Sequence, residues 1–380
     1  MDATGPLARR FPLVARPRPG CPPLDRRVKT LCALAESAAR NQDRTRASAV
    51  LNQAALLASD VGLPELARQW CHRHAAVYLR ARPLDAQAAR HGLEPLVNLA
   101  RLAVRDGDGD AAFHLLTTLA DAVSARVDTT IDGTVVPAAS LTATDGDHNS
   151  VCTWLWTVLL SDGTRALTSV GRWREAHEHL RRRRGIGQRL LDGRQVAVLA
   201  HFFAGDPDTA LALLNDTSAS EPWEEAVAAC LTVLCLGQNG GAIHTAQARE
   251  RYLALAPDPG LLVFRVRLGL TLLHLVGASE SGSTELVDHL ASEVIQASDG
   301  YVARDILGDE AAAALISGGA RAALTSVVHA SGLGVGTIPP VLMSTLLSAL
   351  ERSEAAMEAV LNTPTRSSGS ETRSPPPTLV

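Results

Sequence analysis

Lysine is almost absent from this sequence: Lys29 is the only lysine among its 36 basic residues. The phosphate-binding loop of nucleotide hydrolases, the Schiff base of pyridoxal enzymes and the β3 strand of protein kinases each need a lysine in a defined local sequence. Lys29 lies beside neither a glycine-rich loop nor a strand of the kinase type. The sequence therefore excludes these three classes of enzyme.

Disulfide patterns and long apolar runs are lacking as well. The six cysteines are scattered without a C-x-x-C pair, which predicts reduced and mostly buried thiols. No apolar run reaches the roughly 18 residues that a membrane-crossing helix needs, and the stretch 11–15 is too short for a signal peptide. We therefore expect a cytoplasmic protein without a membrane partner. The excess of arginine and alanine is typical of high-GC bacterial genomes and indicates a bacterial source.

Both ends of the chain have the composition of disordered tails. Residues 1–24 contain six prolines and four arginines, and residues 363–380 are rich in serine, threonine and proline. Such segments bury too little apolar surface to offset the entropy of ordering them. Between the tails, alanine and leucine recur at helical spacing, as in Leu31, Leu34, Ala35 and Ala38. The sequence predicts an all-α body.

The predicted helices are separated by a recurring pattern in which a glycine is followed five residues later by an alanine. A glycine that accepts positive φ ends one helix, and a small alanine lets the next helix pack closely against it. The pairs are Gly62/Ala67, Gly107/Ala112, Gly171/Ala176, Gly205/Ala210 and Gly241/Ala246. The last three glycines lie 34 and 36 residues apart, so the pattern predicts successive helical hairpins.

This period and these turns resemble the tetratricopeptide repeat (TPR) family. The resemblance is carried by G-L-P-E-L-A (62–67), G-D-G-D-A-A (107–112), G-R-W-R-E-A (171–176) and G-D-P-D-T-A (205–210). It covers about residues 44–126 and 150–256, and it is degenerate, because larger residues such as His74 and Leu119 stand where the family has its second small residue. The resemblance implies stacked hairpins in an α-α superhelix with a curved inner surface.

One segment, 127–149, interrupts the helical pattern. It carries β-branched residues around Asp132-Gly133, a dipeptide that favours a two-stranded hairpin. A connection of this length inside a compact array is either functional or disordered. It divides the array into a predicted N-terminal block (25–126) and a C-terminal block (150–362).

An excess of positive charge lies between Arg165 and Arg194, where nine arginines face three acidic residues. The turn 181–184 can be the solvated end of a helix, where cations complement the dipole, or a face that recognises carboxylates and phosphates. Tryptophans nearby pack helices or serve as hot spots for a bound peptide. The candidate partner-binding residues are Trp154, Trp156, Arg172, Trp173, Arg181, Arg182, Arg183 and Arg184.

Three further patterns are better explained by structure than by chemistry. Asp106, Asp108 and Asp110 lack the glycine and glutamate of a calcium loop and are expected to cap a helix. The segment 71–74, C-H-R-H, cannot converge on a zinc ion without a ligand from elsewhere. The glycines of 332–336, G-L-G-V-G, follow no strand and are expected to connect two helices. We predict no metal and no cofactor.

Two functions remain open. The first is a non-catalytic module, a regulatory or accessory protein that binds a protein or peptide segment on a curved helical surface, with an acidic partner as one option. The alternative is an all-α enzyme or enzyme subunit for a small or peptidic substrate, with 127–149 as a lid over a pocket. Nucleic-acid binding by the arginines is a weaker third possibility, because few aromatic residues accompany them.

Overall fold

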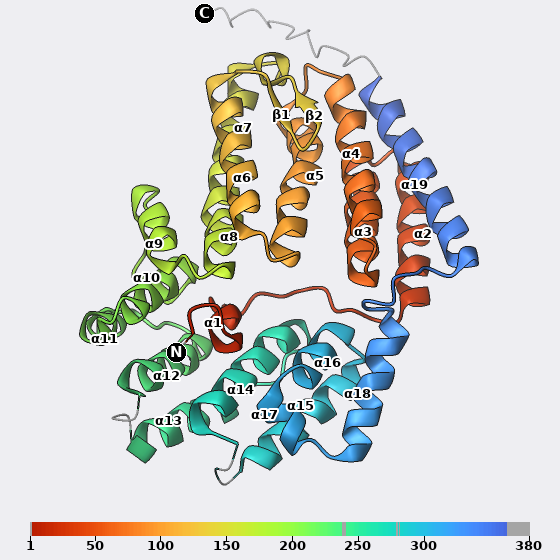
Figure 1. Ribbon diagram of the computed structural model, residues 1–380. Helices are drawn as coiled ribbons and strands as arrows, with labels where there is room; N and C mark the ends of the chain where they lie inside the picture. Colours follow the sequence, from red (N-terminus) through yellow and green to blue (C-terminus); the bar gives the residue numbers. More distant parts are fainter. Residues whose placement is uncertain (1, 238–240, 279, 281, 363–380) are drawn as a thin grey trace, which may run out of the picture.

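The structure, a computed structural model, describes residues 2–237, 241–278, 280 and 282–362, and these are almost entirely helical (Figure 1). The first part of the chain forms α1 (Pro6–Arg10), α2 (Leu24–Asn41), α3 (Arg44–Val61), α4 (Pro64–Arg80), α5 (Ala86–Arg105), α6 (Gly109–Ala125), α7 (Asp145–Val158), a π-helical turn η2 (Leu159–Gly163) and α8 (Thr164–Ser169). The second part forms α9 (Trp173–Arg182), α10 (Asp192–Phe203), α11 (Pro207–Asn215), α12 (Pro222–Leu236), α13 (Gly241–Leu253), η4 (Pro259–Leu261), α14 (Leu262–Val276), α15 (Ser283–Ala297), α16 (Gly300–Leu307), α17 (Glu310–Leu315), α18 (Gly318–Ser331) and α19 (Pro340–Leu361). The all-α prediction is confirmed.

Aspartates and prolines begin many of these helices. An aspartate side chain accepts a hydrogen bond from a backbone N–H of the first turn, which has no partner within the helix. This cap is present at Asp43, Asp85, Asp108, Asp206, Asp299 and Asp309. The capping role expected of Asp108 is therefore confirmed, with Ala111 N as its donor at 2.9 Å.

Four of the five predicted glycine turns have the expected geometry. Gly62, Gly107, Gly171 and Gly205 all have positive φ, and the alanines five residues after them are fully buried. In the fifth pair only the glycine is as predicted: Gly241 has positive φ, but Ala246 on α13 is exposed instead of buried. In α13 the buried positions are instead Ala248 and Tyr252, so the helix presents a different face to its neighbours.

Consecutive helices pack against one another, and their buried side chains form two apolar clusters. The first group comprises α2–α8, which stand side by side in Figure 1. The second comprises α9–α18; in Figure 1 α9 stands beside α8, and α12 and α14–α18 lie below the first group. The two clusters meet between Ala166 and Leu167, inside α8, so the apolar interior does not divide at 127–149 as the predicted blocks do.

The last helix returns to the beginning of the array. α19 packs against α2, α3 and α4, and Leu346, Leu350 and Met357 belong to the apolar cluster of the first group. Before it, the 332–336 connector docks on the end of α3, where the Gly334 and Gly336 amides donate to the carbonyls of Asp60 and Val61 at 2.8 and 2.6 Å. The chain thus closes on itself, and the glycines connect two helices as expected.

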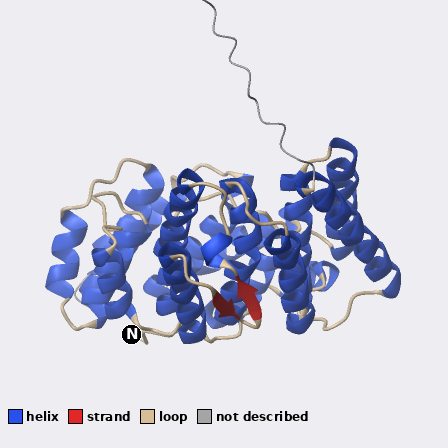
Figure 2. Ribbon diagram, turned by 90° about the horizontal axis from the view of Figure 1, so that it is seen from above, coloured by secondary structure: helices blue, strands red, loops and turns tan. Residues whose placement is uncertain are grey.

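The 127–149 segment contains a two-stranded antiparallel hairpin, β1 (Thr129–Ile131) and β2 (Thr134–Val136), followed by a 3₁₀ turn, η1 (Ala138–Ser140) (Figure 2). Asp132 and Gly133 form its turn, both with positive φ. Ile131 and Val136 are buried in the cluster of the first group. The hairpin is fixed to α4, because Arg68 and His72 contact Asp132 at 2.7 and 3.0 Å.

The prediction of a disordered N-terminal tail is corrected by the structure. Residues 2–23 contain α1 and then cross between the two helical groups (Figure 1). Leu7, Ala8, Phe11 and Leu13 are at most 3% exposed, in the apolar cluster of the second group. A low content of apolar residues predicted disorder for this segment. The prediction fails because its four apolar side chains pack into the apolar cluster of the second group. The predicted C-terminal tail, 363–380, lies outside the described residues.

One helical stretch, Pro259–Val276, is long and apolar enough to cross a membrane, by length and composition only. The sequence analysis had predicted no stretch of this kind. More than half of it is buried within the protein. It carries Arg265 and Arg267, which pair with Glu293 and Asp305 at 3.0 Å. Its burial in the second group accounts for its apolar composition, since a central helix contacts neighbours on most sides.

Candidate functional site

The four arginines of the predicted binding turn lie at the C-terminal end of α9. Arg181, Arg182 and Arg184 are exposed, and the described residues give none of them an ion pair. Arg183 is half-buried and donates from Nη1 to His179 Nδ1 at 3.3 Å. His179 in turn donates from Nε2 to the Leu159 carbonyl at 2.8 Å, and burial lowers the pKa of this imidazole. The ring is therefore neutral and ties the turn to the π-helical segment.

Arg172, by contrast, is occupied by carboxylates. It stands at the N-cap of α9, where its Nε donates to Glu175 at 2.8 Å and its terminal nitrogens contact Asp110 and Glu175. Hydrogen bonds to these two carboxylates raise its pKa above the usual arginine value. Arg172 joins α6 to α9 and would have to leave both acids to bind a partner.

The tryptophans of the predicted site occupy three different environments. Trp173 is 2% exposed, stacks near Phe203 with ring centroids 5.3 Å apart, and donates from Nε1 to the Ala3 carbonyl at 2.9 Å. Trp154 is half-buried, with the Arg90 guanidinium 5.7 Å from its ring centroid. Trp156 is 43% exposed. Trp154 and Trp156 belong to α7 of the first group, whereas Trp173 and the arginine turn belong to α9 of the second.

The two histidines of 71–74 have different partners, and among the described residues His74 Nε2 has none. His72 touches Thr134 Oγ1 at 2.7 Å and Asp132 Oδ2 at 3.0 Å. His74 is buried, donates from Nδ1 to Asn52 Oδ1 at 3.2 Å, and has its pKa lowered to about 3 by burial. Among the described residues, no group of three histidine, cysteine or acidic side chains is placed to hold a metal ion.

The N-terminal segment occupies the inner face of the second group as an extended ligand would. Gln195 on α10 contacts both backbone groups of Leu13: its Oε1 accepts from Leu13 N, and its Nε2 donates to Leu13 O, each at 2.7 Å. Further along, the Arg18 N–H donates to the Gly260 carbonyl at 3.3 Å, and the Gly300 N–H donates to the Cys21 carbonyl at 2.8 Å. Backbone-directed bonds of this kind hold a peptide whatever its side chains.

Two acidic residues fix the direction of this segment. Arg10 pairs with Asp309 at the start of α17 and donates to the Leu270 carbonyl of α14 at 3.1 Å. Arg16 pairs with Asp192 at the start of α10. Because residue 10 lies beside residue 270 and residue 18 beside residue 260, the segment runs antiparallel to α14.

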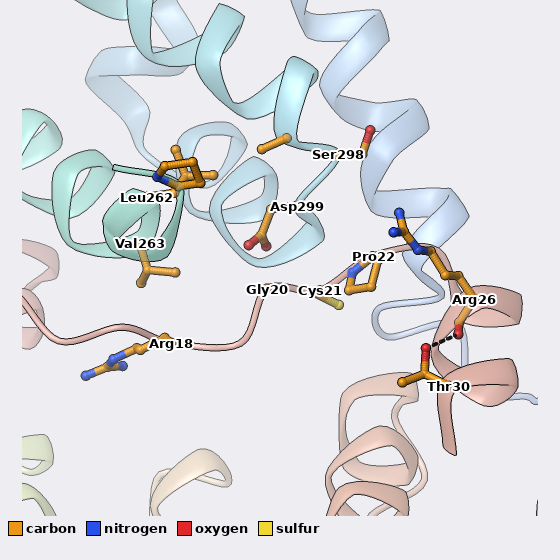
Figure 3. A pocket seen from close by; sticks show the side chains of 12 residues that line it. Arg18, Gly20, Cys21, Pro22, Arg26, Thr30, Leu262, Val263, Ser298 and Asp299 are labelled. Carbon is orange, nitrogen blue, oxygen red and sulfur yellow. Dashed lines mark hydrogen bonds between the residues drawn. The ribbon is translucent and has the colours of Figure 1, made fainter. Parts of the chain in front are cut away.

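A cavity of about 470 Å³ opens where the segment leaves this face (Figure 3). It lies between the segment, at Arg18 and Gly20, the start of α2, at Arg26, and the second group, at Leu262 and Asp299. Asp299 is not a free acid, because its carboxylate caps α16 through Tyr301 N at 2.9 Å. A second cavity of about 320 Å³ lies between α11, α12 and α13. Neither cavity is lined by a residue of 127–149.

Asp60 connects the two groups close to this cavity. Its side chain is 2% exposed and accepts from Arg27 at 2.5 Å, from Arg105 at 2.9 Å and from the Tyr301 hydroxyl at 2.5 Å. Burial and the Asp60 charge raise the pKa of Tyr301, so the phenol stays protonated and donates. Three helices of the first group are thereby joined to α16 of the second.

Sequence reasoning missed Gln195, Asp60 and the N-terminal segment. The N-terminal segment could have been recognised from Leu7, Phe11 and Leu13, because a solvated tail has no reason to carry these large apolar residues. Comparison with known proteins found no matching family model, no matching curated protein and no matching solved structure.

Proposed function

We propose that this chain is a non-catalytic helical-repeat protein of TPR-like construction that binds an extended protein or peptide segment. The glycine turns at 62, 107, 171 and 205, each followed by a fully buried alanine, support a repeat origin for its hairpins. A repeated hairpin exposes one helix of each pair on the inner side of the array, which gives a long surface rather than a closed pocket.

The observation that carries the proposal is the grip of Gln195 on the backbone of Leu13. A fully buried glutamine that satisfies both backbone groups of an extended residue is a device for peptide recognition. Apolar pockets for Leu7, Phe11 and Leu13 supply the affinity, at about 1.5–3 kcal/mol for each buried large side chain. We call the surface around Gln195, Leu270 and Asp309 that contacts the N-terminal segment the groove. In this chain the groove holds the N-terminal segment of the same chain.

The groove and the α9 turn favour partners of opposite charge. In the groove the acids Asp192 and Asp309 receive arginines, so an external peptide that replaces the N-terminal segment should combine apolar with basic residues. The exposed Arg181, Arg182 and Arg184 favour an acidic partner instead, and Trp156 adds exposed apolar surface on α7. The groove is the primary site in this proposal, and the turn is a secondary one.

The enzyme alternative finds less support. A lid over a substrate would lie above a pocket, but the 127–149 hairpin is anchored flat on α4 and α6 by Asp132, Ile131 and Val136. The two cavities described above contain none of its residues. The hairpin thus extends the surface of the first group.

The test weakens the binding of the N-terminal segment to the groove and supplies the unchanged segment as a separate peptide. In the full chain, Leu7→Ala with Leu13→Ala removes apolar contacts of the segment and leaves the groove intact. A fluorescently labelled peptide of residues 2–21 should then bind this variant at least about tenfold more tightly than the wild type, whose tethered segment competes at an effective concentration near millimolar. Fluorescence anisotropy measures both affinities.

Two comparisons decide the result. Adding Gln195→Ala to the weakened variant should reduce binding again, because the backbone clamp is lost. A scrambled peptide should not bind. If the weakened variant remains helical by circular dichroism yet does not bind the peptide, or binds the scrambled one equally well, the groove is not a peptide site.

A further inference from the structure

The cavity of about 470 Å³ is lined by two side chains of opposite charge that do not pair with each other. Asp299, directly before α16, lines it from the second group, and Arg26, in the first turn of α2, lines it from the first. Among the ion pairs of the described residues none joins these two. The cavity therefore separates a negative from a positive group, and its volume lies in the range of about 300–1,000 Å³ that is usual for small-molecule sites.

Asp299 is a buried carboxylate with one oxygen left over. The residue is 6% exposed, and its Oδ1 accepts from Tyr301 N at 2.9 Å. Within the described part of the chain, Oδ2 has no hydrogen-bond or ion-pair partner. In Figure 3 the carboxylate points toward Gly20 of the N-terminal segment, where a Cβ atom would lie 2.7 Å from Oδ2. A charge buried to this degree is normally paired, so Oδ2 is an acceptor site that lacks its donor.

Arg26 is the matching cation on the other side of the cavity. Its guanidinium group is exposed and has no ion pair or hydrogen bond with any described residue. In Figure 3 it extends from α2 toward the second group. Its neighbours in sequence are occupied, because Asp25 pairs with Lys29 at 3.2 Å and Arg27 pairs with Asp60 at 2.5 Å. Arg26 is thus available to an anion in the cavity.

The walls between these two charges are mostly apolar. Arg18 also lines the cavity, but its side chain runs along the segment and away from Asp299 in Figure 3. The Thr30 hydroxyl lies at the rim and is used locally, since it donates to the Arg26 carbonyl at 2.9 Å. The apolar wall residues are Pro22, Pro259, Leu262, Val263 and Ala297. A ligand that fits has an apolar body, a positive group at one end and a negative group at the other.

We propose that this cavity binds a free α-amino acid with an apolar side chain. The ammonium group donates to Asp299 Oδ2, the carboxylate accepts parallel hydrogen bonds from Arg26, and the side chain packs against Leu262 and Val263. A simple amine would leave Arg26 without a partner, and a simple carboxylate would leave Asp299 without one. The zwitterion serves both and adds no net charge.

The site is independent of the proposed peptide groove, because Gln195 and Asp309 do not line this cavity. Its walls come from the N-terminal segment, from α2 and from the second group. A bound amino acid therefore joins three parts of the fold where the segment crosses from one group to the other.

The experiment measures binding of L-leucine and L-phenylalanine to the full chain by isothermal titration calorimetry. Wild-type protein should bind at least one of them at a single site. The matched probes are isocaproate and isoamylamine, which are leucine without its ammonium group and without its carboxylate, and hydrocinnamate and phenethylamine, which are the same pair for phenylalanine. Each probe should bind at least about tenfold more weakly than its parent amino acid, because each lacks one charge-assisted contact.

Substitutions locate the site. Asp299→Asn keeps the oxygen that caps α16 and removes the charge, and Arg26→Gln breaks no described ion pair. Each should weaken the affinity by about tenfold or more. Ala297→Phe leaves both charges in place but fills the cavity, and it should abolish binding. The controls Asp288→Asn and Arg181→Gln change exposed residues outside the cavity and should bind as the wild type does.

Circular dichroism confirms that each variant is folded before its affinity is compared. The proposal is overturned if neither amino acid binds wild-type protein, or if a probe with a single charge binds as tightly as its parent amino acid. It is also overturned if folded Asp299→Asn or folded Arg26→Gln binds as tightly as the wild type.

Discussion

Gln195 holds the backbone of Leu13 although the two residues are 182 positions apart in the chain. The amide makes a third bond, from Nε2 to the Leu190 carbonyl at 2.9 Å, so its orientation is fixed before the segment docks. The glutamine is fully buried, and each of its polar atoms has a partner. This contact turns a proline-rich stretch of low helical propensity into an ordered part of the second group.

Gln195→Ala should loosen the N-terminal segment more than it disturbs the helices. Three hydrogen bonds are lost and two backbone groups of Leu13 remain buried without partners, which costs about 2–4 kcal/mol in total. Trypsin should then cleave after Arg9 and Arg10, which unlike Arg16 and Arg18 are not followed by proline, faster than in the wild type, as followed by mass spectrometry. The control, Gln188→Ala, changes an exposed glutamine of the same type. Equal cleavage rates in all three proteins would show that the clamp does not hold the segment.

Asp60→Asn should destabilise the junction between the two groups. The carboxylate faces Arg27, Arg105 and Tyr301, and an amide leaves the buried Arg27 without its counter-charge. Breaking a buried pair on one side costs about 3–5 kcal/mol. Asp25→Asn removes only the exposed pair with Lys29 and should leave the stability nearly unchanged. Urea denaturation gives both free energies of unfolding, and similar values for the two variants would contradict the role of Asp60.

Local rules predicted the parts of the fold that depend on neighbours in sequence. The turn at Gly171 and the buried Ala176 are five residues apart, and the cap Asp108 bonds to Ala111. The N-terminal segment, the Asp60 junction and the return of α19 depend on contacts between residues far apart in sequence. No periodicity within a segment reports such partners.

The two kinds of tryptophan in the predicted site should respond differently to truncation. Trp173→Ala removes a fully packed ring and its bond to Ala3, so it should cost about 3–5 kcal/mol of unfolding free energy. Trp156→Ala removes a ring that is 43% exposed and should change stability by less than about 1 kcal/mol. Denaturant unfolding compares them. A large loss from Trp156→Ala would mean that this ring packs the first group instead of offering a free surface.

The six thiols should fall into two classes of reactivity. Cys21, Cys71, Cys230 and Cys235 are buried, and burial raises the pKa of the Cys71 and Cys230 thiols to about 12. Cys32 and Cys152 are partly exposed. Because the thiolate is the reactive form, iodoacetamide at pH 8 should label Cys32 and Cys152 first and the other four only after denaturation. Peptide mass spectrometry identifies the sites, and early labelling of Cys230 would contradict its burial.

His74 should make the protein less stable as the pH falls below neutrality. Its pKa is lowered to about 3 in the folded state, mainly by burial, whereas in the unfolded chain it returns to about 6.5. Between these values the unfolded chain binds a proton that the folded protein refuses, so the free energy of unfolding decreases with decreasing pH. The slope from this residue is about 1.4 kcal/mol per pH unit inside that window.

Substitution isolates this contribution from that of other buried histidines. His74→Gln keeps an amide within reach of Asn52 but cannot be protonated, so its unfolding free energy should decrease less steeply between pH 6 and pH 4 than that of the wild type. The slope is the readout, because lost packing shifts stability at every pH alike. His329→Gln alters an exposed histidine and serves as the control. If His74→Gln retains the wild-type slope, the imidazole is protonated in the folded protein, and the helices around it must open to admit the charge.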